Sequence, residues 1–343
     1  MKTRIVTTAD HRFFVRTGGS GPPLVLLHAS PMTSASLLPL AEGLADRFTV
    51  VAVDTPGYGR SAPLPTPPRA LADYVPAFRQ LFAALGLERF HLYGTATGAQ
   101  LAIRIALTEP GRVERLYLDN AAHFTDEQAA AIVEDYFPGL APQWDGRHLL
   151  RAWTMVRNLL RYFPWFDERE SARVGTQLPP AAVLHTIARD YLTAGAGYAT
   201  AYRLAFAHER AANVRALTVP TTLFHHRGSI IERYIRQLTE QDLPPNVVVV
   251  PTPAPAADKA AAVRQEMLRH ATGAADFQLQ LGSCAPAPSP GPDPTLLPPG
   301  LHQPPRPDEY GNYLTTAWFQ LRDHAPGAAP AELHRRLLTW LHQ

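Results

Sequence analysis

The stretch HLYGTATGAQLAIRIAL, residues 91–107, joins a short apolar run to a helical pattern across two closely spaced glycines. Gly94 and Gly98 allow a strand and a helix to approach each other closely, which forces the residue midway between them into a strained turn at the start of the helix. That middle residue is Ala96. The sequence therefore predicts a strand, a sharp turn and a helix, with only a methyl group at the apex of the turn.

Strand-like and helix-like patterns alternate along the chain around this turn. The runs PLVLLHA (23–29) and FTVVAVD (48–54) are short and apolar, as is typical of strands buried on both faces. Helical patterns follow at 34–48 and 71–85, and VERLYLD (113–119) is a further strand pattern. Alternation at this spacing predicts an α/β fold with a doubly wound, mostly parallel sheet.

The pattern turns helical and aromatic between residues 121 and 216, and strand patterns resume at 217–226. We therefore expect a core of residues 1–120 and 217–343, with residues 121–216 forming a helical cap over the carboxyl edge of the sheet, where open α/β sheets bind ligands. Residues 283–307 contain ten prolines, which predicts an extended linker with little helix, and a final amphipathic helix is expected from Pro330.

Composition limits the classes of partner. The 343 residues carry a net charge of +2 without a block of like charge, so neither nucleic acid nor a membrane surface is an expected partner. The single cysteine, Cys284, excludes an intramolecular disulfide. Because no signal-like segment and no run of about 18 apolar residues occurs, we expect a cytoplasmic protein.

Two segments echo each other. GRHLLRAWTMVRN (146–158) and GNYLTTAWFQLRD (311–323) share Gly, Leu, Ala, Trp and Arg at equal offsets. They predict two amphipathic helices that each bury a tryptophan, either separately or as a pair that lines one pocket.

The glycine turn and two other motifs carry a family resemblance. LLHASP (26–31) resembles an oxyanion loop, DTPGYGRS (54–61) is similar to a D-x-P-G-x-G-x-S turn, and Gly94 to Gly98 matches G-x-S-x-G apart from Ala96. Together they resemble the α/β-hydrolase fold family, in its capped branch of epoxide hydrolases and haloalkane dehalogenases. The resemblance implies a hydrolase for a small apolar ester or epoxide, with an oxyanion hole formed by the backbone N–H groups of Ser30 and Thr97.

The same resemblance exposes what the catalytic set lacks. Ala96 cannot act as a nucleophile, and loss of the nucleophile costs a triad enzyme on the order of 10⁶-fold in turnover. The position of the usual acid falls on Ser229, so Asp119 becomes the candidate acid, or else a carboxylate that caps its loop. Glu232 lies beyond Ser229 on a predicted helix, where we expect it to be solvated. The candidate histidines for the catalytic base are His324 and His225. His226, His270 and His302 are further possibilities.

Other candidate site residues follow from position. Aromatic residues of the predicted cap suggest an apolar substrate pocket, although such clusters more often form a core. The candidate pocket residues are Trp153, Tyr162 and Trp165 of the cap, together with His28 of the oxyanion loop. In the family frame His28 is also expected to hold the loop from beneath. No metal-ligand spacing, phosphate loop or dinucleotide fingerprint occurs, so we expect no metal and no cofactor.

Three functions remain open from the sequence. The first is a hydrolase acting on a small apolar ester-like or epoxide-like substrate. The second is a lyase-type or isomerase-type enzyme that uses a histidine base and the oxyanion hole, whose donors do not require a serine at position 96. The third is a catalytically inactive protein that binds a small molecule.

Overall fold

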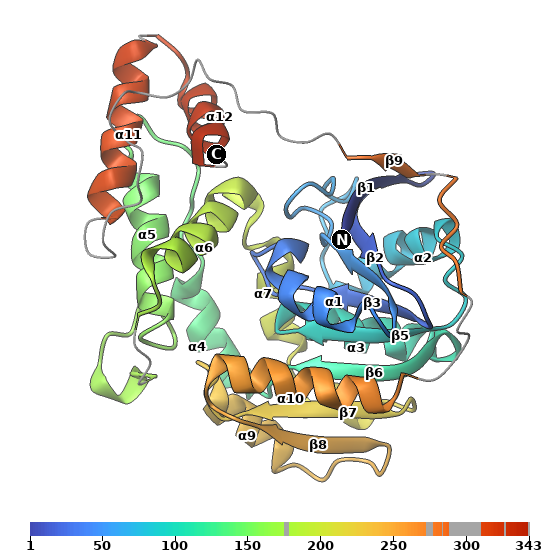
Figure 1. The fold of residues 1–343 in the computed structure, drawn as a ribbon. Helices are drawn as coiled ribbons and strands as arrows, with labels where there is room; N and C mark the ends of the chain where they lie inside the picture. Colours follow the sequence, from blue (N-terminus) through green and yellow to red (C-terminus); the bar gives the residue numbers. More distant parts are fainter. Residues whose placement is uncertain (175–177, 272–276, 283, 288–309, 326, 342–343) are drawn as a thin grey trace. The chain divides into compact units, whose positions relative to one another are not determined.

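In a computed structural model, the described residues 1–174, 178–271, 277–282, 284–287, 310–325 and 327–341 contain a nine-stranded sheet in the order β8-β7-β6-β5-β3-β4-β2-β1-β9 (Figure 1). The strands are β1 (Lys2–Thr7), β2 (Arg12–Gly18), β3 (Pro23–Leu27), β4 (Thr49–Val53), β5 (Phe90–Thr95), β6 (Val113–Asp119), β7 (Thr221–His226), β8 (Val247–Thr252) and β9 (Cys284–Pro286). The six neighbouring strands β4, β3, β5, β6, β7 and β8 pair in parallel. The pairs β4–β2, β2–β1 and β1–β9 are antiparallel. The predicted α/β fold with a mostly parallel sheet is confirmed.

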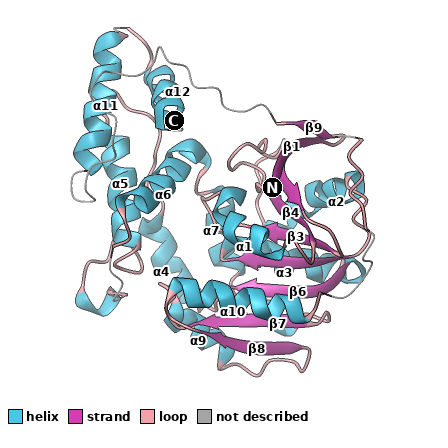
Figure 2. Ribbon diagram, in the orientation of Figure 1, coloured by secondary structure: helices cyan, strands magenta, loops and turns pink. Residues whose placement is uncertain are grey.

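Helices cover both faces of this sheet (Figure 2). The helices are α1 (Leu38–Leu44), α2 (Val75–Ala84), α3 (Thr97–Thr108), α4 (Asp126–Tyr136), α5 (Arg147–Leu159), α6 (Ala181–Ala194), α7 (Thr200–His208), α8 (Ala211–Arg215), α9 (Glu232–Thr239), α10 (Ala256–Arg269), α11 (Tyr310–His324) and α12 (Pro330–Leu341). One buried cluster joins Ala41 of α1 and Met267 of α10 to Phe224 of β7. Because side chains alternate along a strand, His225 faces the opposite side, where it contacts α9.

Two compact units make up the chain. The first, with the sheet, comprises Met1–Val133 and Tyr198–Ala287, and the second comprises Glu134–Gly197 and Pro288–Gln343. We expected residues 217–343 to complete the core, but α11 packs on α5 and α12 packs on α6, within the second unit. An amphipathic pattern shows that a helix buries one face, but it does not show which surface receives that face.

The second unit has its own aromatic and histidine interior. Trp318 of α11 is fully buried, and its Nε1 donates to the carbonyl oxygen of Trp144 at 3.0 Å. The His148 ring lies 4.8 Å from Trp318 and 5.3 Å from His334, centroid to centroid. Burial, together with a smaller effect of His334, lowers the pKa of His148 to about 4. The two echoing segments therefore form α5 and α11, which pack together.

The segment that we predicted to be a proline-rich linker is only partly described. Residues 284–286 form β9, which pairs with β1 between Val6 and Cys284; residues 288–307 lie outside the described part of the chain. Among the described residues, no helix is both long and apolar enough to cross a lipid bilayer.

Candidate functional site

The predicted glycine turn joins β5 to α3. Ala96 has φ 49° and ψ −116°, a strained conformation for a residue with a side chain. A Cβ at Gly94 would lie 2.2 Å from the carbonyl oxygen of Gly98, and a Cβ at Gly98 would lie 2.3 Å from the carbonyl oxygen of Leu27. Only glycine fits at either position, so the tight strand-to-helix turn is confirmed and its apex is Ala96.

The two predicted oxyanion donors lie on backbone segments that touch each other. Thr97 is the first residue of α3, so its N–H has no acceptor within the helix. Gly98 packs against the carbonyl groups of Leu27 and His28, at the start of the loop that carries Ser30. The peptide bond between Ser30 and Pro31 is cis. The structure thus brings the loop and the start of α3 together, as an oxyanion hole requires.

His28 supports this loop from beneath. Its side chain is fully buried, its Nδ1 bonds to the carbonyl oxygen of Ala29 at 2.9 Å, and its Nε2 accepts the N–H of Thr55 at 2.9 Å. Burial lowers the pKa of His28, although nearby Asp54 acts in the opposite direction. Both ring nitrogens are used by backbone groups, so His28 holds the loop and does not face an open pocket.

Asp54 holds the second motif in the same way. Its Oδ1 accepts the N–H of Ser34 at 2.8 Å, and its Oδ2 accepts the N–H of Arg60 at 2.9 Å. The DTPGYGRS turn therefore serves to fix the loops beside the glycine turn.

Asp119, the candidate acid, is the last residue of β6 and is buried in an ion pair. Its Oδ2 lies 2.7 Å from Nζ of Lys259 on α10 and accepts the hydroxyl of Tyr93 at 2.8 Å. Its Oδ1 is buried without a partner among the described residues. The backbone oxygen of Asp119 also accepts the N–H of Ala96 at 3.0 Å. The carboxylate is thus neutralised by a lysine on the α10 face of the sheet, which favours the structural interpretation over the catalytic one.

His226 lies on the same face as this ion pair. Burial lowers the pKa of His226, Lys259 lowers it further, and Asp119 opposes both. The imidazole is therefore held neutral close to a charged pair.

His225 points to the other face and has an acidic partner. Its Nε2 lies 3.2 Å from Oε1 of Glu232, and its Nδ1 lies 3.4 Å from the hydroxyl of Thr239. The Glu232 side chain is 31% exposed and the His225 side chain 18% exposed. Glu232 is partly solvated on its helix, as expected, and its carboxylate also lies where it can orient the imidazole beside it.

The remaining histidines lie elsewhere. His324 ends α11 in the second unit, where its exposed ring bonds to the carbonyl oxygen of Gln320 at 2.8 Å. His270 follows α10 and lies 3.2 Å from Glu266. His302 lies outside the described residues. Because His324 sits on a helix rather than in a loop before the last helix, it lacks the local setting that suggested it as the base.

A buried polar cluster that no sequence pattern indicates lies behind the glycine turn. Oε1 of Gln100, one helical turn after Ala96, accepts a hydrogen bond from Nδ1 of His208 at 3.0 Å, and the buried carboxyl group of Glu209 lies beside Gln100. Burial raises the pKa of Glu209 to about 8 and lowers the pKa of His208 to about 4. Both groups are therefore neutral near pH 7. No periodicity or motif marks AHERAA (207–212), so only the fold reveals this cluster.

Asn120 is a second residue that the sequence did not single out. Among the described residues, Ala96 and Asn120 are the non-glycine residues with positive φ, and they follow the adjacent strands β5 and β6. The Asn120 amide donates to the hydroxyl of Thr95 at 3.3 Å, and its Oδ1 is buried with no partner in the described part of the chain. Strained residues with unused polar atoms cluster at functional sites, which places the candidate site at the carboxyl ends of these strands.

The predicted pocket aromatics belong to the second unit. Trp153 is buried on α5, Trp165 donates its Nε1 to the carbonyl oxygen of Tyr136 at 2.9 Å, and Tyr162 pairs with Arg173 in a short bridge. Each therefore takes part in the packing of that unit. In the described residues, no group of three or more His, Cys, Asp or Glu side chains gathers as a metal site.

Comparison with known proteins identifies the frame. A family model described as the alpha/beta hydrolase fold matches residues 22–163, which include both loops and the glycine turn. This chain has the α/β-hydrolase fold. Among solved α/β-hydrolase structures, the thermophilic esterase from Thermogutta terrifontis superposes with a TM-score of 0.58 at 19% identity, over 80% of this chain and all of that chain.

Curated relatives resemble about a third of this chain. Fluoroacetate dehalogenase from a Burkholderia species is 38% identical over 32% of this chain and 38% of its own length. A pimeloyl-(acyl-carrier protein) methyl ester esterase from Aeromonas salmonicida is 32% identical over 36% of this chain and 45% of its own length. The chain thus spans less than half the length of these curated relatives.

Proposed function

We propose that this α/β-hydrolase-fold protein binds a small apolar ester-like or epoxide-like molecule at the glycine turn and does not process it through a covalent intermediate on residue 96. Two curated relatives are named fluoroacetate dehalogenase and pimeloyl-(acyl-carrier protein) methyl ester esterase, and an ester among their named substrates supports the class of ligand. In this role, the N–H groups of the oxyanion hole still bind an oxygen atom of the ligand.

The observation that carries the proposal is the state of the turn itself. Ala96 keeps the strained backbone of a nucleophile position, at φ 49°, and Gly94 and Gly98 keep the close packing that this strain requires. Strain of this kind costs on the order of 1–3 kcal/mol and persists where it positions something useful. With a methyl group at the apex, what it positions is the N–H of Thr97.

The surroundings of the turn support the same conclusion. A triad needs a carboxylate that is free to orient a histidine. Asp119 is instead bound to Lys259 at 2.7 Å, and His324 lies in the second unit with its ring bonded to its own helix. Restoring a nucleophile alone therefore restores no triad.

The test compares the full chain with Ala96→Ser and Ala96→Leu, using p-nitrophenyl butyrate and styrene oxide to follow turnover. Binding is measured separately, as the rise in melting temperature that ethyl butyrate causes. We expect no turnover above the buffer rate in the natural chain or in Ala96→Ser. Ethyl butyrate should raise the melting temperature of the natural chain but not that of Ala96→Leu, whose larger side chain stands at the apex.

Turnover by the natural chain, or a strong gain in Ala96→Ser, would show that a working base and acid are present and would refute the proposal. Equal stabilisation of Ala96→Leu and the natural chain would show that ethyl butyrate does not bind at the turn, and that outcome refutes it as well.

A second candidate function rests on the contact between His225 and Glu232. A histidine oriented by a carboxylate at the end of a strand has the arrangement of a general base, and a general base with an oxyanion hole can remove a proton next to a carbonyl group. Proton exchange of acetophenone in D₂O, followed by NMR, tests for this activity. We expect exchange to be lost in His225→Ala and kept in His270→Ala, which removes a similar histidine–glutamate pair from α10.

A further inference from the structure

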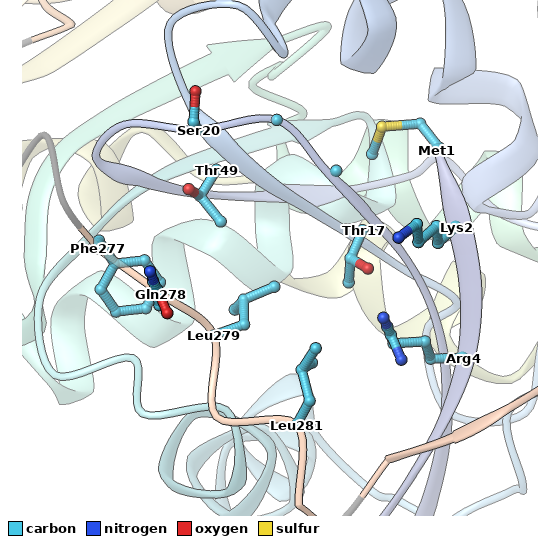
Figure 3. Close-up of a pocket in the computed structure, with 12 residues that line it drawn as sticks. Met1, Lys2, Arg4, Thr17, Ser20, Thr49, Phe277, Gln278, Leu279 and Leu281 are labelled. Atoms are coloured by element: carbon cyan, nitrogen blue, oxygen red, sulfur yellow. The ribbon is translucent and has the colours of Figure 1, made fainter.

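A pocket of about 700 Å³ is lined by residues of β1, β2 and β4 and by residues 277–281 (Figure 3), and it lies at the opposite end of the sheet from the glycine turn. It includes Thr49, the first residue of β4, whereas Ala96 follows the last residue of β5 in the same parallel sheet. A strand of six residues spans about 20 Å, so the two places are separate. The volume falls within the range of about 300–1,000 Å³ that is typical of small-molecule sites.

Strand register brings the polar lining together on one face. Lys2 of β1 stands directly opposite Thr17 of β2, and Arg4 lies two residues along on the same face as Lys2. Thr17 pairs with Val51, so Thr49, two residues before Val51, also shares this face. Figure 3 shows the Lys2 ammonium, the Thr17 hydroxyl and the Arg4 guanidinium directed into the same space.

The facing wall of the pocket is a short apolar strap, defined here as residues 277–282. Phe277, Leu279 and Leu281 of this strap line the pocket. The N–H of Gln280 donates to the carbonyl oxygen of Leu85 at 3.1 Å, just after α2, and β9 pairs with β1 beyond the strap. The strap is therefore held at Gln280 and by the strand that follows it, and the pocket has an apolar wall opposite a cationic one.

Two polar atoms of the pocket are buried without a partner among the described residues. Thr49 is only 5% exposed, yet its hydroxyl is buried without a hydrogen bond, and Nε of Arg4 is likewise unpaired. Neither Lys2 nor Arg4 forms an ion pair with any residue that the structure describes, and no acidic residue lines the pocket. Buried polar atoms are rarely left unpaired, so these groups point to a ligand.

Protection of a sheet edge does not account for these cations. Lysine and arginine on an edge strand can prevent unwanted strand pairing. At Arg4 that edge is already covered, because Arg4 pairs with Pro286 of β9.

We propose that this pocket binds a small molecule with one anionic head and an apolar body. The head contacts Lys2, Arg4 and the hydroxyl group of Thr17, since charge-assisted hydrogen bonds to a cation pair are strong. The apolar body packs on Phe277, Leu279 and Leu281, where it removes apolar surface from water. This site is independent of the function proposed at the glycine turn.

The test uses isothermal titration calorimetry on the full chain with sodium octanoate and octyl phosphate as probes. A ligand of this size is expected to bind with a Kd on the order of 0.1–1 mM. Arg4→Gln should weaken binding about tenfold. Arg12→Gln is the matched control, because Arg12 is exposed at the other end of β2 and should leave binding unchanged.

The comparison of probes decides the chemistry. The tighter of the two probes identifies the head as a carboxylate or a phosphate, and either result supports the proposal when Arg4→Gln weakens it. Octanol binding as tightly as octanoate, or inorganic phosphate binding as tightly as octyl phosphate, would show that head or body is not recognised and would overturn the proposal. So would equal affinities of Arg4→Gln and Arg12→Gln, or no binding of either probe to the natural chain.

Discussion

Lys259→Met removes the cation from the buried ion pair that lies beside the glycine turn. The Asp119 side chain is 4% exposed, and after the substitution its carboxylate keeps only the hydroxyl of Tyr93 as a side-chain partner among the described residues. Breaking a buried pair from one side costs about 3–5 kcal/mol, because a charge is left without compensation. Since the Lys259 side chain is 18% exposed, water can partly replace it, and we expect about 3 kcal/mol.

Asp119→Asn is the complementary change and is expected to cost less, about 1–2 kcal/mol, because the Lys259 ammonium can turn toward water. The double variant Asp119→Asn with Lys259→Met removes both charges. Its cost should stay well below the sum of the two single costs, as expected when two residues interact directly.

The assay must report on the unit that holds the ion pair. All five tryptophans lie in residues 134–197 or 288–343, so tryptophan fluorescence follows the second unit. Hydrogen exchange of peptides from β5 and β6, measured in increasing urea, follows the sheet. Destabilisation of the double variant equal to the sum of the two single variants would show that the pair does not couple, and the structural role of Asp119 would be refuted.

Three further outcomes follow from the structure. Gly98→Ala should lower sheet stability by about 3 kcal/mol or more in hydrogen exchange, because its Cβ would meet backbone atoms at 2.3 Å, whereas Gly111→Ala, with open space around it, should have little effect. Histidine in the unfolded chain is protonated near pH 6.5, whereas folded His148 is protonated only near pH 4, so the stability of the second unit should fall by about 3 kcal/mol as the pH drops from 6.5 to 4. Tryptophan fluorescence in urea measures this fall, which should be smaller in His334→Gln. The pKa of Glu209 is about 8 in the folded protein and about 4.5 in the unfolded chain, so the stability of the sheet should fall as the pH rises through this range. At pH 8, Glu209→Gln should be more stable than the natural chain by on the order of 4 kcal/mol, measured by hydrogen exchange. A stability that does not change with pH would contradict this.

The parts of the fold that could be predicted are those fixed by local rules. Glycine spacing around Ala96 specified a strained turn, because only glycine allows backbones to approach so closely. Short apolar runs specified buried parallel strands for the same kind of local reason. By contrast, α10 is rich in alanine and β9 is only three residues long, and neither has enough periodicity to be recognised before the fold is known.

The candidate site could be predicted only in its backbone. The loop of Ser30 and the start of α3 follow from motifs, whereas the partners of Asp119 and His225 depend on which helices pack on which face. Lys259 reaches Asp119 from α10, far along the chain, and no pattern near residue 119 announces it. Glu232 lies close to His225 in sequence, but their contact depends on how α9 returns to β7.

The composition of the second unit has a consequence for the order of synthesis. Its first segment, 134–197, leaves the ribosome before β7 and β8 are made, and its second segment, 288–343, follows them. The apolar surfaces of α5 and α6 that receive α11 and α12 must therefore wait in water, or on a chaperone, while the sheet is completed. A nascent chain stopped after β8 would hold a finished parallel sheet beside helices that still lack their partners.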